Sequence, residues 1–193
     1  MMEQHLGKPL TSVPDPFGIH ESYGHHNNAL LHKFLDSFGI NYEIYSSTAC
    51  YTKGLFDETL RQVLAHHQAI LDVVLPTLGP ERKATYSPFL PVCPQTGNVL
   101  QVPIDEYRVQ AGTVVYKNDQ GRLTEVPMTG ESCKLQWKAD WGMRWAALGV
   151  DYEISVKDLI DSVKLSTQIC RIIGQPPEGF TYELFRSKFS KNI

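Results

Sequence analysis

The chain has 193 residues, of which 42% are apolar, 10% aromatic and 20% charged, which is typical of a globular protein of one domain or slightly more. This composition excludes a disordered, collagen-like or coiled-coil protein, and a net charge of −3, from 18 Lys and Arg against 21 Asp and Glu, excludes a basic protein that follows a phosphate backbone. Because the sequence has no run of about 18 apolar residues and no apolar stretch near Met1, we expect a cytoplasmic protein with no membrane partner.

The first block, residues 1–84, has the pattern of an α/β unit. Apolar residues at helical spacing predict a helix over residues 28–38, with Gly39 as its C-cap. The alternating residues 40–45 predict a strand. A second apolar stripe predicts one long helix over residues 56–75, ended by the proline that follows.

The second block, residues 85–135, is rich in short strand-like runs separated by turn clusters. We expect two small antiparallel hairpins, which form a β-rich insertion between α/β segments. The four predicted strands are residues 89–92 and 99–104 in the first hairpin, and residues 112–116 and 123–128 in the second.

The third block, residues 136–193, returns to the α/β pattern. A helix is predicted over residues 137–148, and it carries all three tryptophans at every fourth position, so they share one face. A strand (150–154), a polar turn (155–158) and an amphipathic helix (159–173) are predicted to follow. In an open α/β sheet, a turn from the end of a strand into a helix is where ligands bind.

Four carboxylates lie near the tryptophans and this turn, and two interpretations of them stay open. They could hold a cationic or hydroxyl-bearing ligand beside the aromatic face, or they could cap helices around a tryptophan core. The residues concerned are Asp140, Asp151, Glu153 and Asp158.

The sequence contains none of the common catalytic or metal-binding motifs. It has no Gly-x-Gly-x-x-Gly or P-loop pattern, no Gly-x-Ser-x-Gly elbow and no Cys-x-x-Cys pair. Its seven histidines form no recognisable metal-binding arrangement, so we expect reduced thiols and no metal site.

Four long segments of the chain resemble the class I lysyl-tRNA synthetases, in the order of that family and over nearly the whole length. They are GKPLTSVPDPFGIHESYGHHNNALLHKFLDSFGINYE (7–43), ERKATYSPFLPVCPQTGNVLQVPI (81–104), CKLQWKADWGMRWAALGVDYEISVKDLIDS (133–162) and PEGFTYELF (177–185).

The resemblance implies a partial Rossmann-type (HUP-like) parallel sheet with an inserted antiparallel β-hairpin segment. In the family, a helical domain that grips the tRNA anticodon follows the catalytic domain. The implied reaction is ATP-dependent activation of lysine to lysyl-adenylate with release of pyrophosphate, followed by transfer to tRNA-Lys. The implied partners are lysine, ATP with magnesium, and tRNA-Lys.

The resemblance also implies roles for individual residues, although it assigns no catalytic residue. Trp137, Asp140 and Tyr182 match positions expected to bind lysine, and Asp158 matches the nucleotide-binding Asp of a Gly-Lys-Asp turn. Here Val156 stands in place of the glycine of that turn.

Archaeal relatives hold a structural zinc ion with paired cysteines in the inserted segment. In this chain Cys93 has no second cysteine near it, and Thr96 stands where one would fall. We therefore expect no zinc.

The family's phosphate-binding motifs are a His-x-Gly-His type near the start and a Lys-Met-Ser-Lys-Ser type near the end. We expect the chain to begin after the first and to stop before the second, which residues 188–192 (KFSKN) echo faintly. It would then be an interior fragment of the catalytic domain, inactive alone, with an exposed sheet edge that favours self-association. Two alternatives stay open, namely one subunit of a split synthetase, or a non-catalytic module that binds lysine or the tRNA acceptor.

Overall fold

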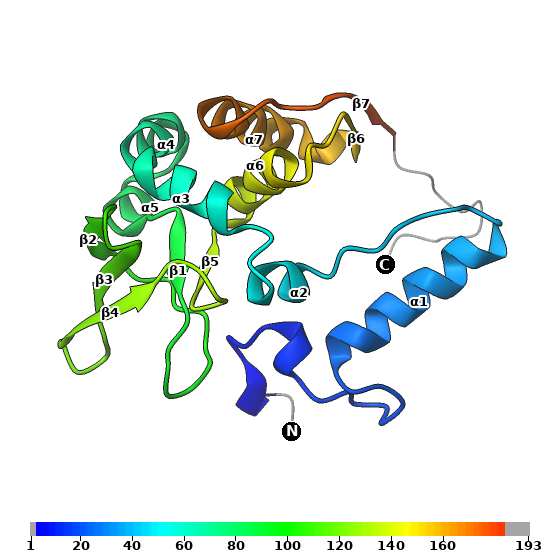
Figure 1. The fold of residues 1–193 in the computed structure, drawn as a ribbon, viewed down its shortest axis with the longest axis horizontal. Coiled ribbons are helices and arrows are strands. Elements are labelled where there is room, and N and C mark those ends of the chain that lie inside the picture. The colour runs from blue at the N-terminus through cyan, green and yellow to red at the C-terminus, as the bar shows by residue number, and fades with distance from the viewer. Residues whose placement is uncertain (1–2, 184–193) are drawn as a thin grey trace.

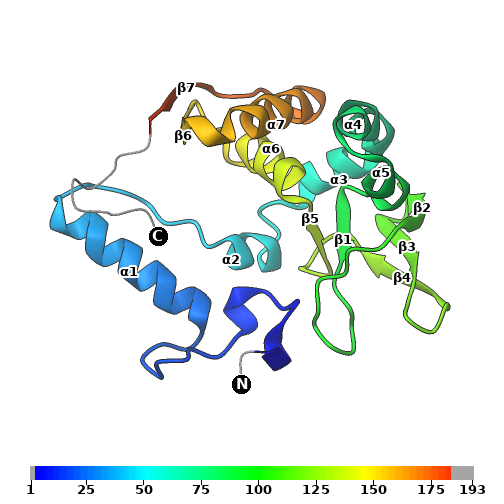
Figure 2. The same cartoon turned by 180° about the vertical axis from the view of Figure 1, so that it is seen from behind.

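The computed structural model of the chain describes residues 3–183. Helices α3, α4, α6 and α7 form one group, with the antiparallel strands on one side of it, and α1 lies apart from this group (Figures 1 and 2). The helices are α1 (Tyr23–Ser37), α2 (Ser47–Thr52), α3 (Asp57–Ala65), α4 (His67–Val74), α5 (Pro80–Thr85), α6 (Trp137–Leu148) and α7 (Ile160–Ile173), with 3₁₀ turns at Glu3–His5, Leu10–Ser12, Leu75–Thr77 and Lys157–Leu159. The strands are β1 (Phe89–Pro91), β2 (Ile104–Arg108), β3 (Thr113–Lys117), β4 (Leu123–Pro127), β5 (Cys133–Leu135), β6 (Tyr152–Val156) and β7 (Glu178–Tyr182).

The first predicted helix is confirmed, but it begins earlier than its apolar pattern does. The hydroxyl of Ser22 accepts a hydrogen bond from the backbone N–H of His25 and caps α1, which begins at Tyr23, five residues before the first predicted position. The helix ends before Gly39, whose φ of +64° is the left-handed conformation that favours glycine.

The strand predicted for residues 40–45 is wrong. This segment runs in an extended form from α1 to α2 (Figure 1), but it pairs with no strand in the described part of the chain. An alternating pattern shows only that a segment suits a sheet, because a strand also needs a neighbour for its backbone groups. The apolar side chains of Ile40, Ile44 and Tyr45 consequently remain exposed.

The single helix predicted for residues 56–75 is two helices, α3 and α4, which meet at His66. The backbone of His66 leaves helical geometry (φ −107°, ψ 20°). Ring Nδ1 of His66 lies 3.0 Å from the carbonyl oxygen of Gln62, and Nδ1 of His67 lies 2.8 Å from that of Leu64. These imidazoles bind carbonyls near the break, while the predicted apolar stripe stays buried on both sides of it.

The first of the two predicted hairpins forms only in part, and the second is confirmed. Strand β1 pairs antiparallel with β5, Phe89 opposite Leu135. The arms of the first hairpin are joined by an isolated bridge between Val92 and Val99 and by a hydrogen bond from the N–H of Leu100 to the carbonyl of Pro91 at 2.8 Å. Pro103 lies within the second predicted strand, and proline cannot donate to a strand ladder. The second hairpin, β3–β4, forms as predicted and gains β2 as a third antiparallel strand.

The third block follows its predicted order. Helix α6 ends at Gly149, whose φ is +59°, and β6 begins two residues later than expected. Strands β6 and β7 pair in parallel, and α7 connects them. Residues 3–183 therefore have a mixed α/β fold with antiparallel and parallel sheets, and the parallel part within them is one strand–helix–strand unit.

One hydrophobic core joins residues from all three blocks of the sequence. Leu60 and Ile70 come from the first block, Tyr116 from the second, and Met143 and Ile169 from the third, and all are almost fully buried. The division into residues 1–84, 85–135 and 136–193 stays a prediction. Between residues 3 and 183, no helix is both long and apolar enough to cross a bilayer.

The loop before α1 is held together by one buried carboxylate, Asp15. Its oxygens accept hydrogen bonds from the backbone N–H groups of Phe17 (3.1 Å), Ile19 (2.9 Å) and His20 (2.9 Å), and Nδ1 of His26 lies 3.3 Å away. Burial tends to raise the pKa of Asp15, but the N–H groups of His20, Phe17 and Ile19 outweigh it and hold the pKa at about 2.

The contribution of the Asp15 loop to the stability of the fold should therefore decrease at acid pH. The pKa in the folded chain, about 2, lies below the ordinary value of 3.8, so ionised Asp15 stabilises the fold above about pH 5, and this contribution disappears as the pH falls toward 2. Asp15→Asn should be less stable than the wild type at neutral pH, with a difference that shrinks between pH 5 and 2. Chemical unfolding at each pH measures this, with Asp119→Asn, in an exposed turn, as control. A constant difference would contradict the assignment.

Candidate functional site

The three tryptophans of α6 form a series of neighbouring rings that runs from the core to the surface, with the first pair stacked and the second tilted. Ring centroids are 5.4 Å apart for Trp137 and Trp141 and 5.3 Å apart for Trp141 and Trp145. Trp145 is 2% exposed and its Nε1–H donates to Oε2 of Glu153 at 2.7 Å, whereas Trp137 is 51% exposed. Trp145 thus belongs to the core, as the second interpretation expects, whereas the exposed indole of Trp137 leaves room for the ligand that the first interpretation expects.

Trp137 lines a cavity of about 590 Å³, which we call the α2–α6 cavity. Its walls come from the start of α6, from α2 and the extended segment before it, and from residues near the start of α1. Besides Trp137 and Asp140, the lining includes Asn27, Asn28, Glu43, Tyr45, Ser47, Thr48, Tyr51, Lys134 and Arg144.

Asp140 is the best-fixed charged group of this cavity. One carboxylate oxygen accepts the hydroxyl hydrogen of Tyr51 at 2.7 Å, and the other accepts from Nη2 of Arg144 at 2.5 Å. Burial, with the nearby charge of Asp140, raises the pKa of Tyr51 far above its usual range, so its hydroxyl stays protonated and can only donate to the carboxylate.

The α2–α6 cavity carries charges of both signs. Glu43 and Asp140 supply carboxylates, and Arg144 and Lys134 supply cations. The ammonium of Lys134 lies 4.3 Å from the ring centroid of Tyr51 and pairs with Glu131 at 2.8 Å. A cavity with paired charges and an indole wall suits a small zwitterion whose cationic end can stack on an aromatic ring.

The other two predicted site residues lie together, but elsewhere. Tyr182 is opposite Val156 at the carboxyl end of the β6–β7 pair, and Asp158 follows Val156 by two positions, in the 3₁₀ turn before α7. Neither residue lines the α2–α6 cavity. The structure thus brings Trp137 to Asp140, and Tyr182 to the region of Asp158, without joining the two pairs in one cavity.

The turn itself accommodates the valine that replaces the family's glycine. Val156 has φ −70° and ψ 149°, which is extended backbone that a β-branched residue adopts readily. No positive φ is required at this position.

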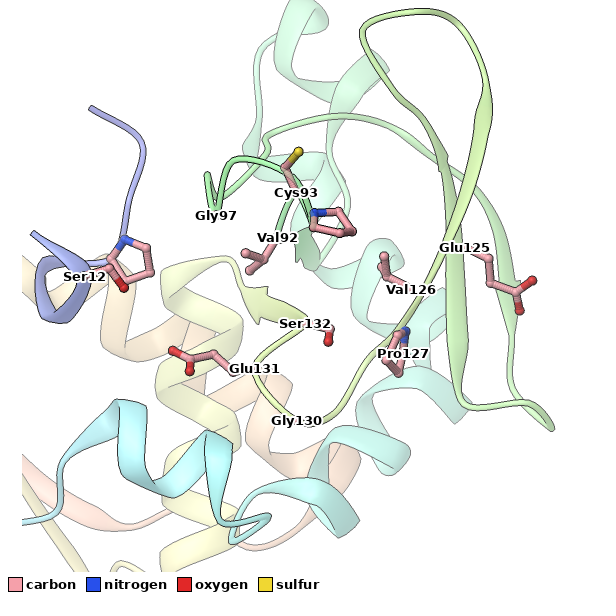
Figure 3. A pocket seen from close by; sticks show the side chains of 12 residues that line it. Ser12, Val92, Cys93, Gly97, Glu125, Val126, Pro127, Gly130, Glu131 and Ser132 are labelled. Carbon is pink, nitrogen blue, oxygen red and sulfur yellow. The ribbon is translucent and has the colours of Figure 1, made fainter. Parts of the chain in front are cut away.

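A second cavity, of about 480 Å³, lies beside β4 and the turn that contains Cys93 (Figure 3). Its carboxylates already have partners, because Glu131 pairs with Lys134 and Glu125 with Arg108, and Figure 3 shows Glu125 pointing away from the other labelled side chains. A hydrogen bond with the Thr96 side chain lowers the pKa of the Cys93 thiol. No group of three metal-binding side chains converges here or anywhere else in residues 3–183.

Sequence reasoning missed three residues of the α2–α6 cavity, namely Tyr51, Lys134 and Arg144. Arg144 could have been found, since it lies four positions after Asp140 and therefore on the same helix face. Tyr51 is 89 positions from Asp140, and nothing in the local pattern links them. The motif echo at residues 188–192 lies outside the described residues.

A family model described as tRNA synthetases class I (K) matches residues 1–193. Proteins named lysine–tRNA ligase from Rickettsia africae and Rickettsia felis are 56% and 55% identical over 194 residues, which is 100% of this chain and 37% of each relative. The lysine–tRNA ligase of Rickettsia prowazekii is 56% identical over 186 residues, 96% of this chain and 35% of the relative. The chain thus spans little more than a third of the length of these relatives.

Proposed function

We propose a function from one premise: the chain belongs to the tRNA synthetases of class I (K), whose family model matches it throughout. On this premise it forms the lysine-recognising part of a lysine–tRNA ligase. The reaction joins lysine to ATP, with magnesium, as lysyl-adenylate and then transfers the lysyl group to tRNA-Lys in the cytoplasm. The strand–helix–strand unit β6–α7–β7 supports a Rossmann-type (HUP-like) arrangement, with residues 85–135 as the insertion.

One observation carries the proposal: helix α6 brings Trp137 and Asp140 to the wall of the same cavity. The side-chain ammonium of lysine would bind the carboxylate of Asp140, and its methylene chain would pack on the exposed indole of Trp137. Tyr182 lies at the end of β7, outside this cavity, so the proposed lysine site consists of Trp137 and Asp140. Asp158 would bind the nucleotide at the carboxyl end of β6.

Calorimetric titration with lysine tests this proposal directly. We expect the wild-type chain to bind lysine, and Trp137→Ala and Asp140→Asn each to bind it at least about tenfold more weakly. Asp140→Asn weakens a hydrogen bond to a charged group, which contributes about 1.5 to 3 kcal/mol. Trp137→Ala leaves the lysine methylene groups exposed, at a cost of about 0.8 kcal/mol for each one that the indole had buried. Asp151→Asn is the matched control, because Asp151 lies near α6 but outside the cavity and should bind normally.

The same protein should be assayed for lysine-dependent exchange between ATP and pyrophosphate. Exchange supports a complete adenylating site, whereas lysine binding without exchange supports the alternative of a binding module or of one subunit of a split enzyme. If the wild type does not bind lysine, the proposed function is wrong for this chain.

We also propose that the chain associates with itself. The β6–β7 pair exposes Tyr152, Ile154 and Phe180, and α1 exposes Phe34 and Phe38. Apolar surface of this kind favours contacts between copies. Sedimentation over a range of concentrations should show dimers, and a monomer at every concentration would contradict this.

A further inference from the structure

We infer that Arg144 is a positioning residue of the α2–α6 cavity: it orients Asp140 and ties α2 to α6. The inference deepens the proposed function, since it concerns how the lysine site is held in shape. None of the roles implied by the resemblance includes Arg144.

One nitrogen of Arg144 binds two acceptors from different parts of the chain. Nη2 contacts Oδ2 of Asp140 at 2.5 Å, one helical turn earlier on α6, and the hydroxyl oxygen of Ser47 at 2.8 Å. Ser47 is the first residue of α2 and lies 97 positions away in the sequence. Nε of Arg144 is buried and makes no hydrogen bond within the described part of the chain, so Nη2 makes the contacts that hold the guanidinium.

Helix α2 depends on such contacts. It has six residues, and isolated helices shorter than about 12 residues are marginal in water. Ser47, Thr48 and Tyr51 of α2 line the cavity, so the position of this short helix sets the shape of the wall opposite Trp137.

The contacts leave Asp140 oriented but not saturated. A carboxylate has about four lone-pair sites. Tyr51 and Arg144 occupy one on each oxygen, and the remaining sites can accept from an ammonium group. Asp140 is 14% exposed, so it cannot reorient freely, and a ligand meets it in a fixed geometry.

The positive charge of Arg144 opposes this effect, because it repels a ligand ammonium. The side chain of Arg144 is 40% exposed, however, and solvent screens the repulsion. We therefore expect orientation to outweigh repulsion, so that removal of Arg144 weakens lysine binding.

The test compares Arg144→Met with Arg144→Lys, since lysine keeps a cation that can reach Asp140. Lysine affinity is measured by calorimetry, and the protection of α2 by amide hydrogen exchange. Arg144→Met should bind lysine at least about tenfold more weakly and should exchange the amides of α2 faster. Arg144→Lys should retain most of the lysine affinity and most of the amide protection of α2. Arg171→Met, which removes an exposed cation from α7, is the control and should change neither.

The two readouts separate the inference from the proposed function. If the wild type binds lysine and Arg144→Met binds it equally well, the inference is overturned and the proposed function stands. If the wild type does not bind lysine, the proposed function fails, and amide hydrogen exchange in α2 decides the inference about Arg144. Unchanged protection of α2 in Arg144→Met then overturns it, and faster exchange that Arg144→Lys reverses supports it.

Discussion

Gly142→Ala should destabilise the protein by about 2 to 3 kcal/mol, although alanine is normally the better helix residue by about 1 kcal/mol. Helices α6 and α7 cross closely at Gly142. A Cβ at this position would lie 2.6 Å from the carbonyl oxygen of Ser166 and 3.2 Å from the backbone nitrogen of Cys170. Both atoms are rigid backbone of α7, so the two helices must move apart and loosen the core around Met143 and Ile169. In a chain of this size, we expect the melting temperature to fall by roughly 5 to 10 °C.

Gly79→Ala provides the control for this substitution. Gly79 precedes α5 with φ −69°, and an added Cβ meets nothing within 4 Å. This variant should stay within about 1 kcal/mol of the wild type, because alanine restricts the unfolded chain but is a poorer N-cap of α5 than glycine. If Gly142→Ala were as stable as Gly79→Ala, the close packing of α6 on α7 would be wrong.

Trp145→Ala should cost about 3 to 5 kcal/mol, the largest effect we expect from a single side chain. The substitution removes an almost fully buried indole, and it leaves Glu153 without the Nε1–H donor at 2.7 Å. Trp145→Phe keeps most of the ring and should cost less, so the difference between the two variants separates packing from the lost hydrogen bond. Chemical denaturation of each purified variant measures both effects.

Trp137→Ala is the matched substitution at the other end of the same helix. Because Trp137 is half exposed, this change should cost less than about 1 kcal/mol. If the proposed function holds, the effects on lysine binding are the reverse of the effects on stability. Trp137→Ala weakens lysine binding at least about tenfold, whereas Trp145→Phe leaves it unchanged. Equal loss of stability in Trp137→Ala and Trp145→Ala would show that the indoles do not differ in burial as described.

The sequence predicted the elements whose structure is decided locally. Helices α1, α6 and α7 have apolar stripes and end at glycines, and these signals act over a few residues. The predictions failed where a partner distant in the sequence decides the outcome. Residues 40–45 suit a strand but have no neighbouring strand among residues 3–183, and β1 forms its ladder with β5 although residues 99–104 are nearer in the sequence.

The residues of the candidate site could likewise be predicted only where their relation is local in the sequence. The spacing of Trp137, Asp140 and Arg144 on one helix can be read from the sequence, because residues three or four positions apart share a face. The contacts of Tyr51 and Ser47 with that face span 89 and 97 positions and depend on how α2 packs. Burial also had to be seen in the structure, since three equally spaced tryptophans gave no sign that the last is core and the first is open to solvent.

The neighbouring indoles of α6 make the intrinsic fluorescence of the protein a probe of the α2–α6 cavity. Rings with centroids about 5.3 and 5.4 Å apart exchange excitation energy efficiently, so light absorbed at the buried end can be emitted from the exposed end. Any molecule that settles against the outermost ring would then alter the emission of the whole series. Occupancy of the cavity can be followed by intrinsic fluorescence, without an added label.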